Sequence, residues 1–244
     1  MGDISNMSKN FTEEIQKFHL MLEAKHPFAL SRFGDGEMIA MRGDTLASGY
    51  GEWMTNGDNP RYTLVRRWLK ESFTYKHSDY HVGIVCPCCQ GQAAFERMRN
   101  QCGQVDANLT FANVFVNSNY NYFVSNIVPL FASRSIHLVA HEEAQVSRLP
   151  FRGQFYPVTR NAWIESIDLV NSLEHLVKET VNDSLFLFAA GPLSKILCHR
   201  LWDLNKTNTY LDIGSTLHPW IKTDLNIRGY YSGGADSHKV CVWG

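Results

Sequence analysis

The sequence predicts an α/β protein with a mostly parallel sheet and helices on both faces. Two observations carry this prediction. Residues 185–190 form a continuous apolar run, which is typical of a parallel strand that is covered on both sides. A helix that begins at Pro192 and a strand over residues 209–214 follow this run, and together they form a βαβ unit. No repeat or linker divides the 244 residues, so we expect one domain over residues 1–244, with residues 1–9 flexible.

The remaining elements follow from apolar spacing and from helix boundary signals. Asn10 and Glu13 have the spacing of a capping box, which predicts a helix over residues 11–24 that ends before Pro27. Further helices are predicted over residues 60–73, 93–100, 119–130 and 160–180, and further strands over residues 28–31, 81–86, 109–116 and 135–140. Residues 37–41 fit either a helix or a strand, residues 43–59 predict a long loop, and residues 226–244 have no predicted path.

Charge and hydropathy exclude several classes of protein. The net charge of −1 and the pI near 6.8 provide no basic excess for binding a nucleic-acid backbone. No apolar run approaches the roughly 20 residues of a membrane span, and the polar N-terminus lacks the layout of a signal peptide. We therefore expect a soluble cytoplasmic protein that does not bind nucleic acid. Peripheral membrane contact stays open, and the composition specifies no oligomeric state.

The six cysteines include the cluster Cys86-Pro87-Cys88-Cys89, which resembles a metal-binding knuckle. No second cysteine pair follows at the spacing of a zinc ribbon, and one such cluster does not readily supply four tetrahedral ligands. The favoured interpretation is therefore that these are reduced structural thiols at the end of an apolar strand.

The segment Arg32-Phe33-Gly34-Asp35-Gly36-Glu37 follows the predicted strand over residues 28–31. Glycines flank Asp35, which indicates a tight bend or the close approach of another group. If the segment is extended, Asp35 and Glu37 point to the same side. Two carboxylates near Arg32 would then suit a divalent cation and a phosphate. The alternative is a surface turn with solvated acids.

Two further strand ends carry polar groups. The turn Ala190-Gly191-Pro192-Leu193-Ser194 opens a helix whose free amides could face an anion, and Asp212 ends the strand that follows. If these strands neighbour the strand before Arg32, the three segments line one crevice, because ligands gather at the carboxyl ends of parallel strands. A diphosphate with a bridging cation would fit such a crevice. His141-Glu142-Glu143 could face it too, although a solvated loop is the favoured interpretation.

Residues 28–37, Phe-Ala-Leu-Ser-Arg-Phe-Gly-Asp-Gly-Glu, resemble the signature of the GT-D-type glycosyltransferases, a family once catalogued as a domain of unknown function. The hallmark of that family is an Asp-x-Glu motif. A second resemblance covers residues 187–197 and 210–214, which correspond to the family's apolar strand, Gly-Pro turn, helix and Asp-Ile-Gly strand. A shorter block, Arg-Asn-Ala-Trp at residues 160–163, precedes it. The resemblance spans residues 28–220, and two motifs in order are more specific than either alone.

The resemblance implies a single Rossmann-like domain, a nucleotide-sugar donor such as a UDP-sugar, and Mn²⁺ or Mg²⁺. By position, Asp35 and Glu37 are the Asp-x-Glu pair and the expected metal ligands. Arg32 would contact phosphate or hold the acids in place. The donor-binding set implied by the two motifs comprises Arg32, Gly34, Gly36, Gly191, Pro192 and Ser194.

The sequence departs from the family after Gly214. Relatives continue with several acids before a tryptophan, whereas this chain has Ser215-Thr216-Leu217-His218-Pro219-Trp220. A catalytic base from that acidic run cannot be carried over. His218 is one candidate, because imidazole titrates near neutral pH, and a structural histidine is the competing interpretation. Asp212 is the other candidate for the base. The competing interpretation is a strand-end acid whose carboxylate accepts hydrogen bonds from backbone amides.

The hypothesis from the sequence is a metal-dependent, inverting glycosyltransferase that moves a sugar from a nucleoside diphosphate sugar to a hydroxyl of a glycan or glycoconjugate acceptor. Two alternatives stay open. One is a Rossmann-like methyltransferase or hydrolase. The other is a catalytically inactive glycan-binding relative, which the missing acids after Gly214 favour weakly.

Overall fold

The computed structural model describes residues 8–45, 53–55, 60–222, 228–231 and 233–244. Within these ranges the chain forms one seven-stranded sheet in the order β3-β2-β1-β7-β6-β4-β5, and every pair of neighbouring strands is parallel. The predicted α/β class with a parallel sheet is confirmed. The expected loop over residues 43–59 and the expected flexible N-terminus lie largely outside the described residues.

The strands are β1 (Ala29–Arg32), β2 (Tyr80–Ile84), β3 (Leu109–Phe111), β4 (Ile136–His141), β5 (Gln154–Val158), β6 (Leu185–Ala189) and β7 (Thr209–Asp212). The helices are α1 (Phe11–Glu23), α2 (Asp35–Arg42), α3 (Arg61–Thr74), α4 (Pro87–Gln90), α5 (Gln92–Cys102), α6 (Tyr120–Tyr122), α7 (Val128–Phe131), α8 (Ala162–Glu165), α9 (Ile167–Glu179), α10 (Pro192–Leu204) and α11 (His218–Ile221).

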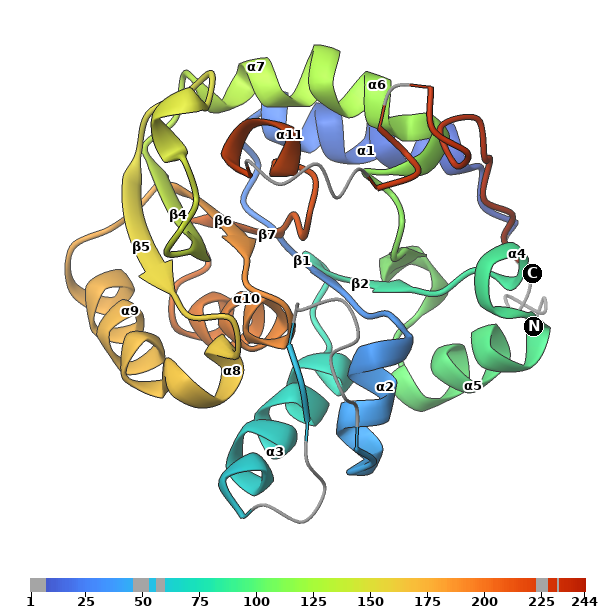
Figure 1. Cartoon of the computed structure of the whole chain (residues 1–244), viewed down its shortest axis with the longest axis horizontal. Coiled ribbons are helices and arrows are strands. Elements are labelled where there is room, and N and C mark those ends of the chain that lie inside the picture. Colours follow the sequence, from blue (N-terminus) through green and yellow to red (C-terminus); the bar gives the residue numbers. More distant parts are fainter. Residues whose placement is uncertain (1–7, 46–52, 56–59, 223–227, 232) are drawn as a thin grey trace.

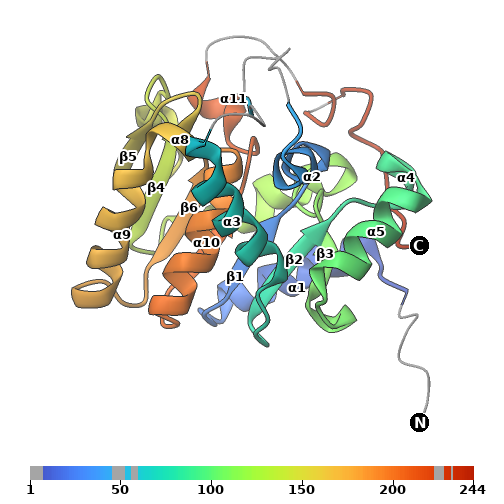
Figure 2. The ribbon, with the colours of Figure 1, turned by 90° about the horizontal axis from the view of Figure 1, so that it is seen from below.

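Helices cover both faces of the sheet, as the apolar strands require. Helices α1, α6 and α7 lie on one face, and α3, α5, α9 and α10 lie on the other (Figures 1 and 2). Phe18 of α1 and Leu197 of α10 are fully buried on these two sides. None of the helices in the described ranges has the length and hydropathy needed to span a bilayer.

The N-terminal helix begins where the capping signal predicts. The Asn10 side chain accepts hydrogen bonds from the backbone N–H groups of Thr12 (2.9 Å) and Glu13 (3.2 Å), which would otherwise have no partner in the first turn. The helix buries Phe11, Ile15, Phe18 and Leu22 and ends at Glu23.

The segment after β1 is helical from Asp35 onward. This settles the choice left open for residues 37–41 in favour of a helix, α2. Successive helical residues are turned by about 100°, so Asp35 and Glu37 do not share a side as they would in an extended segment.

Two predicted elements are interrupted in the structure. The strand predicted over residues 109–116 ends at Phe111, because Val114 and Val116 donate their N–H groups to nearby backbone carbonyls in turns. The helix predicted over residues 119–130 contains a π-helical segment, Phe123–Ile127, just before Pro129. Proline lacks the N–H that a regular helix requires, so the local widening has an identifiable cause.

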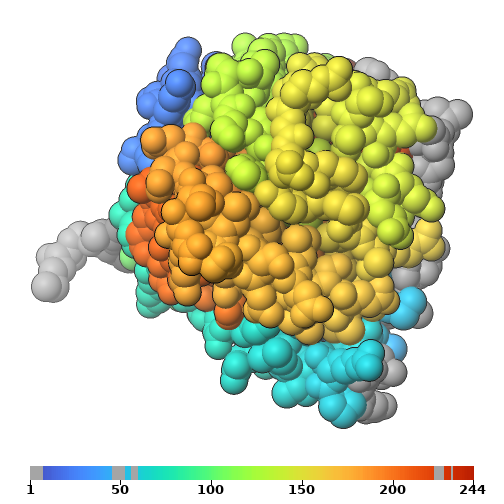
Figure 3. All heavy atoms as spheres, turned by 90° about the vertical axis from the view of Figure 1, so that its left-hand side faces the viewer, coloured from blue at the N-terminus to red at the C-terminus, as the bar shows by residue number. Residues whose placement is uncertain are grey.

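The region after β4 also differs from the prediction. The single helix predicted over residues 160–180 is divided into α8 and α9 at Ser166, whose backbone is not helical. Strand β5 was not predicted from the sequence; it contains Pro157 and is partly exposed. This strand lies at the edge of the sheet, where a residue without an N–H is tolerated. The space-filling view from that side shows β5 and α9 at the surface (Figure 3).

Candidate active site

A cavity of about 600 Å³ opens at the carboxyl ends of the strands. It lies where β1, β7, β6, β4 and β5 are neighbours, so residues at or just after the end of each strand contribute to its lining. The charged and imidazole side chains of the lining are Arg32, Glu37, His141, Glu143, Arg160, Lys195, Asp212, His218, Lys222 and Arg228. Arg32, Gly191 and Asp212 all line this cavity, as expected from the sequence if their three segments share one crevice.

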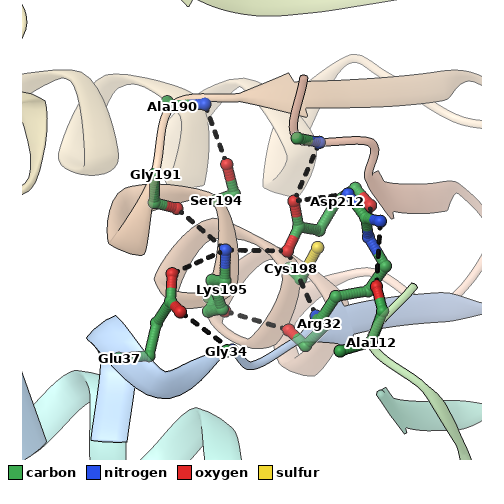
Figure 4. Close-up of polar contacts among 12 residues, drawn as sticks. Arg32, Gly34, Glu37, Ala112, Ala190, Gly191, Ser194, Lys195, Cys198 and Asp212 are labelled. Atoms are coloured by element: carbon green, nitrogen blue, oxygen red, sulfur yellow. Dashed lines mark hydrogen bonds and ion pairs between the residues drawn. The ribbon is translucent and has the colours of Figure 1, made fainter. Parts of the chain in front are cut away.

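Lys195 joins the two sequence motifs at the floor of this cavity. Its Nζ lies 3.0 Å from Glu37 Oε1 and 3.0 Å from Asp212 Oδ2, and it donates to the Gly191 carbonyl at 3.3 Å (Figure 4). An ammonium group has three N–H donors, and these contacts use all of them. Lys195 thus fixes both carboxylates and the Gly191 turn relative to one another.

Burial alone would lower the pKa of Lys195. The carboxylates of Asp212 and Glu37 outweigh that effect, so the pKa of Lys195 lies above its usual value. The lysine is therefore a permanent cation at the floor of the cavity near neutral pH. It cannot supply or accept a proton in the way that a lysine with a lowered pKa does.

Asp212 is fully buried, and its carboxylate accepts hydrogen bonds from donors of the chain itself. Oδ2 accepts from Arg32 N at 3.1 Å as well as from Lys195, and Oδ1 accepts from Gly214 N at 3.1 Å. Arg32 Nη2 lies 3.8 Å from Oδ1. These contacts are typical of a strand-end acid that accepts backbone amides, which is the alternative to a catalytic base at Asp212.

Arg32 lies at the end of β1 and also points to the cavity floor. Its Nε donates to the Asp212 carbonyl at 2.6 Å and its Nη1 to the Ala112 carbonyl at 3.0 Å. A guanidinium has five N–H donors, so donors remain on Nη1 and Nη2 for a ligand. Gly214 permits this arrangement, since it has a φ of +51° and a Cβ there would lie 2.5 Å from Arg32 Nη2.

The two acids of the Asp-x-Glu motif have different surroundings. Glu37 is buried, and its Oε2 accepts from the Gly34 N–H at 2.9 Å while Oε1 holds Lys195. Asp35 is exposed, its Oδ1 accepts from Gly36 N at 2.9 Å, and among the described residues no basic side chain pairs with it. Asp35 and Gly36 do not line the cavity, whereas Gly34 and Glu37 do.

A divalent cation requires several oxygen ligands. The ammonium of Lys195 stands between Glu37 and Asp212, so these two carboxylates do not fit a metal ion while Lys195 is in place. Asp35 offers an accessible carboxylate. Mg²⁺ commonly binds through one or two carboxylates together with the phosphates of a substrate. Asp35 lies outside the cavity lining, so it would serve in this way only if its side chain turned toward a bound diphosphate.

The turn after β6 has the form that the Gly-Pro pair predicts. Gly191 has a φ of +56°, and a Cβ at this position would lie 3.0 Å from Trp53 Cδ1. Pro192 begins α10, and Ser194 Oγ accepts from the Ala190 N–H at 3.0 Å. Gly191 lines the cavity, but Pro192 and Ser194 are buried behind it. Ser194 therefore shapes the turn rather than facing the cavity.

Two histidines line the cavity. His218 begins α11 and is half-buried. His141 ends β4, and its Nδ1 lies 3.7 Å from Glu143 Oε2. The structure places His141 and Glu143 on the wall of the cavity, so the segment after β4 is part of the site.

Four basic residues that line the cavity had no role predicted from the sequence: Lys195, Arg160, Lys222 and Arg228. For Lys195 a signal existed: a charged residue stands in an otherwise apolar stretch of α10, where seven of its neighbours in the helix are buried hydrophobic residues or proline. Arg160 comes just after β5 and Lys222 directly after α11, and only the tertiary structure brings Arg160, Lys222 and Arg228 to one cavity.

Neither a scan against protein-family models nor a search of curated proteins found a match to this sequence. Solved structures do match. One, at 16% identity, covers 83% of this chain and 77% of its own with a TM-score of 0.55, and is described as the highly conserved domain of unknown function 1792 with a distinct glycosyltransferase fold. Another, at 17% identity with a TM-score of 0.57, covers 83% of this chain and 80% of its own, and is described as a new glycosyltransferase (DUF1792) from Streptococcus sanguinis.

A selenomethionine-substituted structure of the same domain gives a TM-score of 0.57 at 15% identity. At such identities the likeness concerns the fold. It agrees with the family resemblance found in the sequence motifs. This chain therefore has the glycosyltransferase fold of the DUF1792 domains.

Proposed function

We propose that this chain is a glycosyltransferase that moves a sugar from a nucleoside diphosphate sugar to a hydroxyl of a glycan or glycoconjugate acceptor, with inversion at the sugar carbon. One observation carries the proposal: the two motifs that resemble GT-D enzymes meet through Lys195 at the floor of a 600 Å³ cavity. The choice of a uridine nucleotide rests on the motif resemblance.

The charges of the lining support an anionic donor. At the floor, Arg32 and Lys195 balance Glu37 and Asp212, so the floor adds no net charge. Among the described residues of the rim, Arg160 and Lys222 add two cations and Glu143 adds one carboxylate. Such a surplus of positive charge attracts a diphosphate and stabilises it as it leaves.

The residues at the floor act in different ways under this proposal. Arg32 contacts the diphosphate through its remaining N–H groups, since its side chain is 10% exposed and reaches the cavity. Lys195, Glu37 and Asp212 are positioning residues that hold Arg32 and the Gly191 turn in place. Asp212 is therefore a poorer candidate for the base than His218, because its carboxylate already accepts from Arg32, Lys195 and Gly214.

A divalent ion, Mn²⁺ or Mg²⁺, is part of the proposal, with Asp35 as its protein ligand beside the donor phosphates. When bound, such an ion screens the charge of the departing diphosphate. The metal role predicted for Glu37 would require its carboxylate to leave Lys195. His218 is the proposed base, which would take the proton of the acceptor hydroxyl in an inverting displacement.

A cytoplasmic location belongs to the same proposal. None of the six cysteines forms a disulfide, which is consistent with a reducing compartment.

The test is a transfer and hydrolysis assay with a panel of sugar nucleotides, with and without Mn²⁺. We expect turnover of one donor, loss of that turnover in Arg32→Ala, and loss of the Mn²⁺ response in Asp35→Ala. Glu179→Ala, an exposed acid on α9, is the matched control. Donor binding without turnover would identify a binding relative, and binding of S-adenosylmethionine instead of any sugar nucleotide would overturn the assignment.

A further inference from the structure

Four cysteine thiols from two distant parts of the chain meet beside α4. The Sγ atoms of Cys86, Cys88, Cys89 and Cys241 all lie within 4.8 Å of one another. Cys86 and Cys88 are separated by 3.2 Å between their Sγ atoms, and Cys89 and Cys241 by 3.9 Å, although Cys241 stands 152 residues beyond Cys89. None of these cysteines forms a disulfide.

These separations match one tetrahedral metal ion. Zinc binds thiolates at about 2.3 Å, which places the sulfurs of a tetrahedral site about 3.8 Å apart. A disulfide would require a separation of about 2.05 Å. An iron–sulfur cluster places several iron and sulfide atoms between its cysteines, so it requires wider separations than those observed. We propose that Cys86, Cys88, Cys89 and Cys241 form a structural site for one Zn²⁺ ion, bound by four thiolates.

The backbone explains how a short segment supplies three ligands. Cys86 precedes α4, Pro87 begins it, and the N–H groups of Cys89 and Gln90 both donate to the Cys86 carbonyl at 3.1 Å. The resulting tight turn directs the three sulfurs to one side. Cys241 completes the set from the C-terminal segment, which returns to α4 (Figures 1 and 2).

Hydrogen-bond donors surround the sulfurs as they do in thiolate metal sites. The Val242 N–H lies 3.4 Å from Cys88 Sγ, Asn113 Nδ2 lies 3.4 Å from Cys89 Sγ, and Asn117 Nδ2 lies 3.4 Å from Cys241 Sγ. A neutral thiol is a weak acceptor, so three amide donors directed at three sulfurs favour thiolates. Donors of this kind orient metal ligands and are part of the site.

The proposed site offers an alternative to the interpretation of Cys86, Cys88 and Cys89 as structural thiols alone. That interpretation relied on the missing second pair of a zinc ribbon, and the fourth ligand is instead a single distant cysteine. Cys86 and Cys241 are buried, whereas Cys88 is exposed and leaves an entry path for the ion.

The zinc site would anchor the segment that completes the cavity. Trp243, next to the site, packs its ring edge-to-face on Phe95 (5.1 Å) and Phe111 (5.0 Å). Earlier in the same segment, Tyr230 lines the cavity and Tyr231 donates to the Ser215 carbonyl at 2.8 Å. The ion therefore has a structural role beside the cavity, since Asn113 both lines the cavity and donates to Cys89 Sγ. The zinc proposal does not rest on the proposed activity.

The experiment measures zinc in the full chain, purified under reducing conditions and desalted, by mass spectrometry of the metal. We expect about one zinc per chain, its loss in Cys241→Ser and Cys88→Ser, and its retention in Cys102→Ser, a buried cysteine outside the cluster. Asp35→Ala should also retain the zinc, which separates this site from the donor site.

A second measurement does not depend on the folding of any variant. Removal of zinc from the wild-type chain by a chelator should lower its melting temperature, and Co²⁺ added in its place should give the intense visible absorption of a tetrahedral tetrathiolate. Zinc well below one equivalent in folded, reduced protein would overturn the proposal. A disulfide within the cluster under those conditions would overturn it too, as would zinc that persists in both serine variants.

Discussion

Replacement of Lys195 by methionine tests whether the ammonium holds the cavity floor together. Methionine is unbranched and only one atom shorter than lysine, so it keeps most of the apolar stem but removes the charge. Glu37, with 10% of its side chain exposed, and Asp212, with none exposed, would then face each other without the cation between them. Two buried carboxylates that lose their common partner destabilise the folded state, because each keeps its desolvation cost.

The loss of stability can be worked out from the charges that remain after the substitution. Loss of one partner of a buried ion pair costs about 3–5 kcal/mol. Arg32 Nη2, 3.8 Å from Asp212 Oδ1, still offsets part of the charge, which favours the lower end of that range. For a chain of this size, 1 kcal/mol corresponds to roughly 2–4 °C in melting temperature. We therefore expect Lys195→Met to melt roughly 6–12 °C below the wild type.

The assay is thermal unfolding followed by circular dichroism, with a denaturant titration for the free energy of unfolding. Lys206→Met is the control, because Lys206 is 41% exposed and its ion pair with Asp203 lies at the surface. It should change stability by less than about 0.5 kcal/mol. The double variant Lys195→Met with Glu37→Gln should recover at least about 1 kcal/mol, since it removes one of the stranded charges. A Lys195→Met protein that melts within 2 °C of wild type, about 1 kcal/mol or less, would refute the reasoning.

Four further predictions concern the site and the pH dependence. Gly214→Ala should lower donor affinity at least about tenfold, because a Cβ at 2.5 Å displaces the Arg32 guanidinium; titration calorimetry with the nucleotide checks this, and unchanged affinity would contradict it. His218→Ala should lower kcat about 10²–10⁴-fold and remove the acidic limb of the pH–rate profile; an unchanged limb would exclude it as the base. Asp35→Asn should raise the Mn²⁺ concentration required for half-maximal rate, and an unaltered metal titration would count against Asp35 as ligand. Burial, with Lys17 beside it, lowers the pKa of His81 from 6.5 to about 3. Between pH 6.5 and pH 3 only the unfolded state takes up this proton, so His81 should lower the free energy of unfolding by about 2 kcal/mol from pH 7 to pH 5. His81→Phe should remove this part of the pH dependence in denaturant titrations.

The sequence predicts those parts of the fold that depend on local signals. The Asn10 cap, the apolar run that becomes β6 and the Pro192 start of α10 lie where local chemistry places them. The division of the predicted helix at Ser166 and the unpredicted strand β5 depend on tertiary context. Pro157 argues against a strand in general, and only the edge position of β5 makes it acceptable.

The candidate site shows the same division. Motif resemblance and strand-end reasoning identified Arg32, Glu37, Gly191, Asp212 and His218, which all line the cavity. The contacts between these segments are long-range, so neither the ammonium between Glu37 and Asp212 nor the meeting of Cys241 with α4 follows from any local pattern.

The order of the strands has a consequence for how the cavity forms during folding. β1 pairs directly with β7, with Ala29 beside Tyr210, so the two strands of the described sheet that are farthest apart in sequence are neighbours at its centre. Contacts between residues so distant in sequence form slowly, because a long loop must close before they contribute. Folding intermediates in which β7 has not yet docked would leave Arg32 without its Asp212 contacts, and the proposed donor site would not yet exist. The ability to bind the nucleotide should therefore appear only in the final phase of refolding, after most of the helical signal has returned.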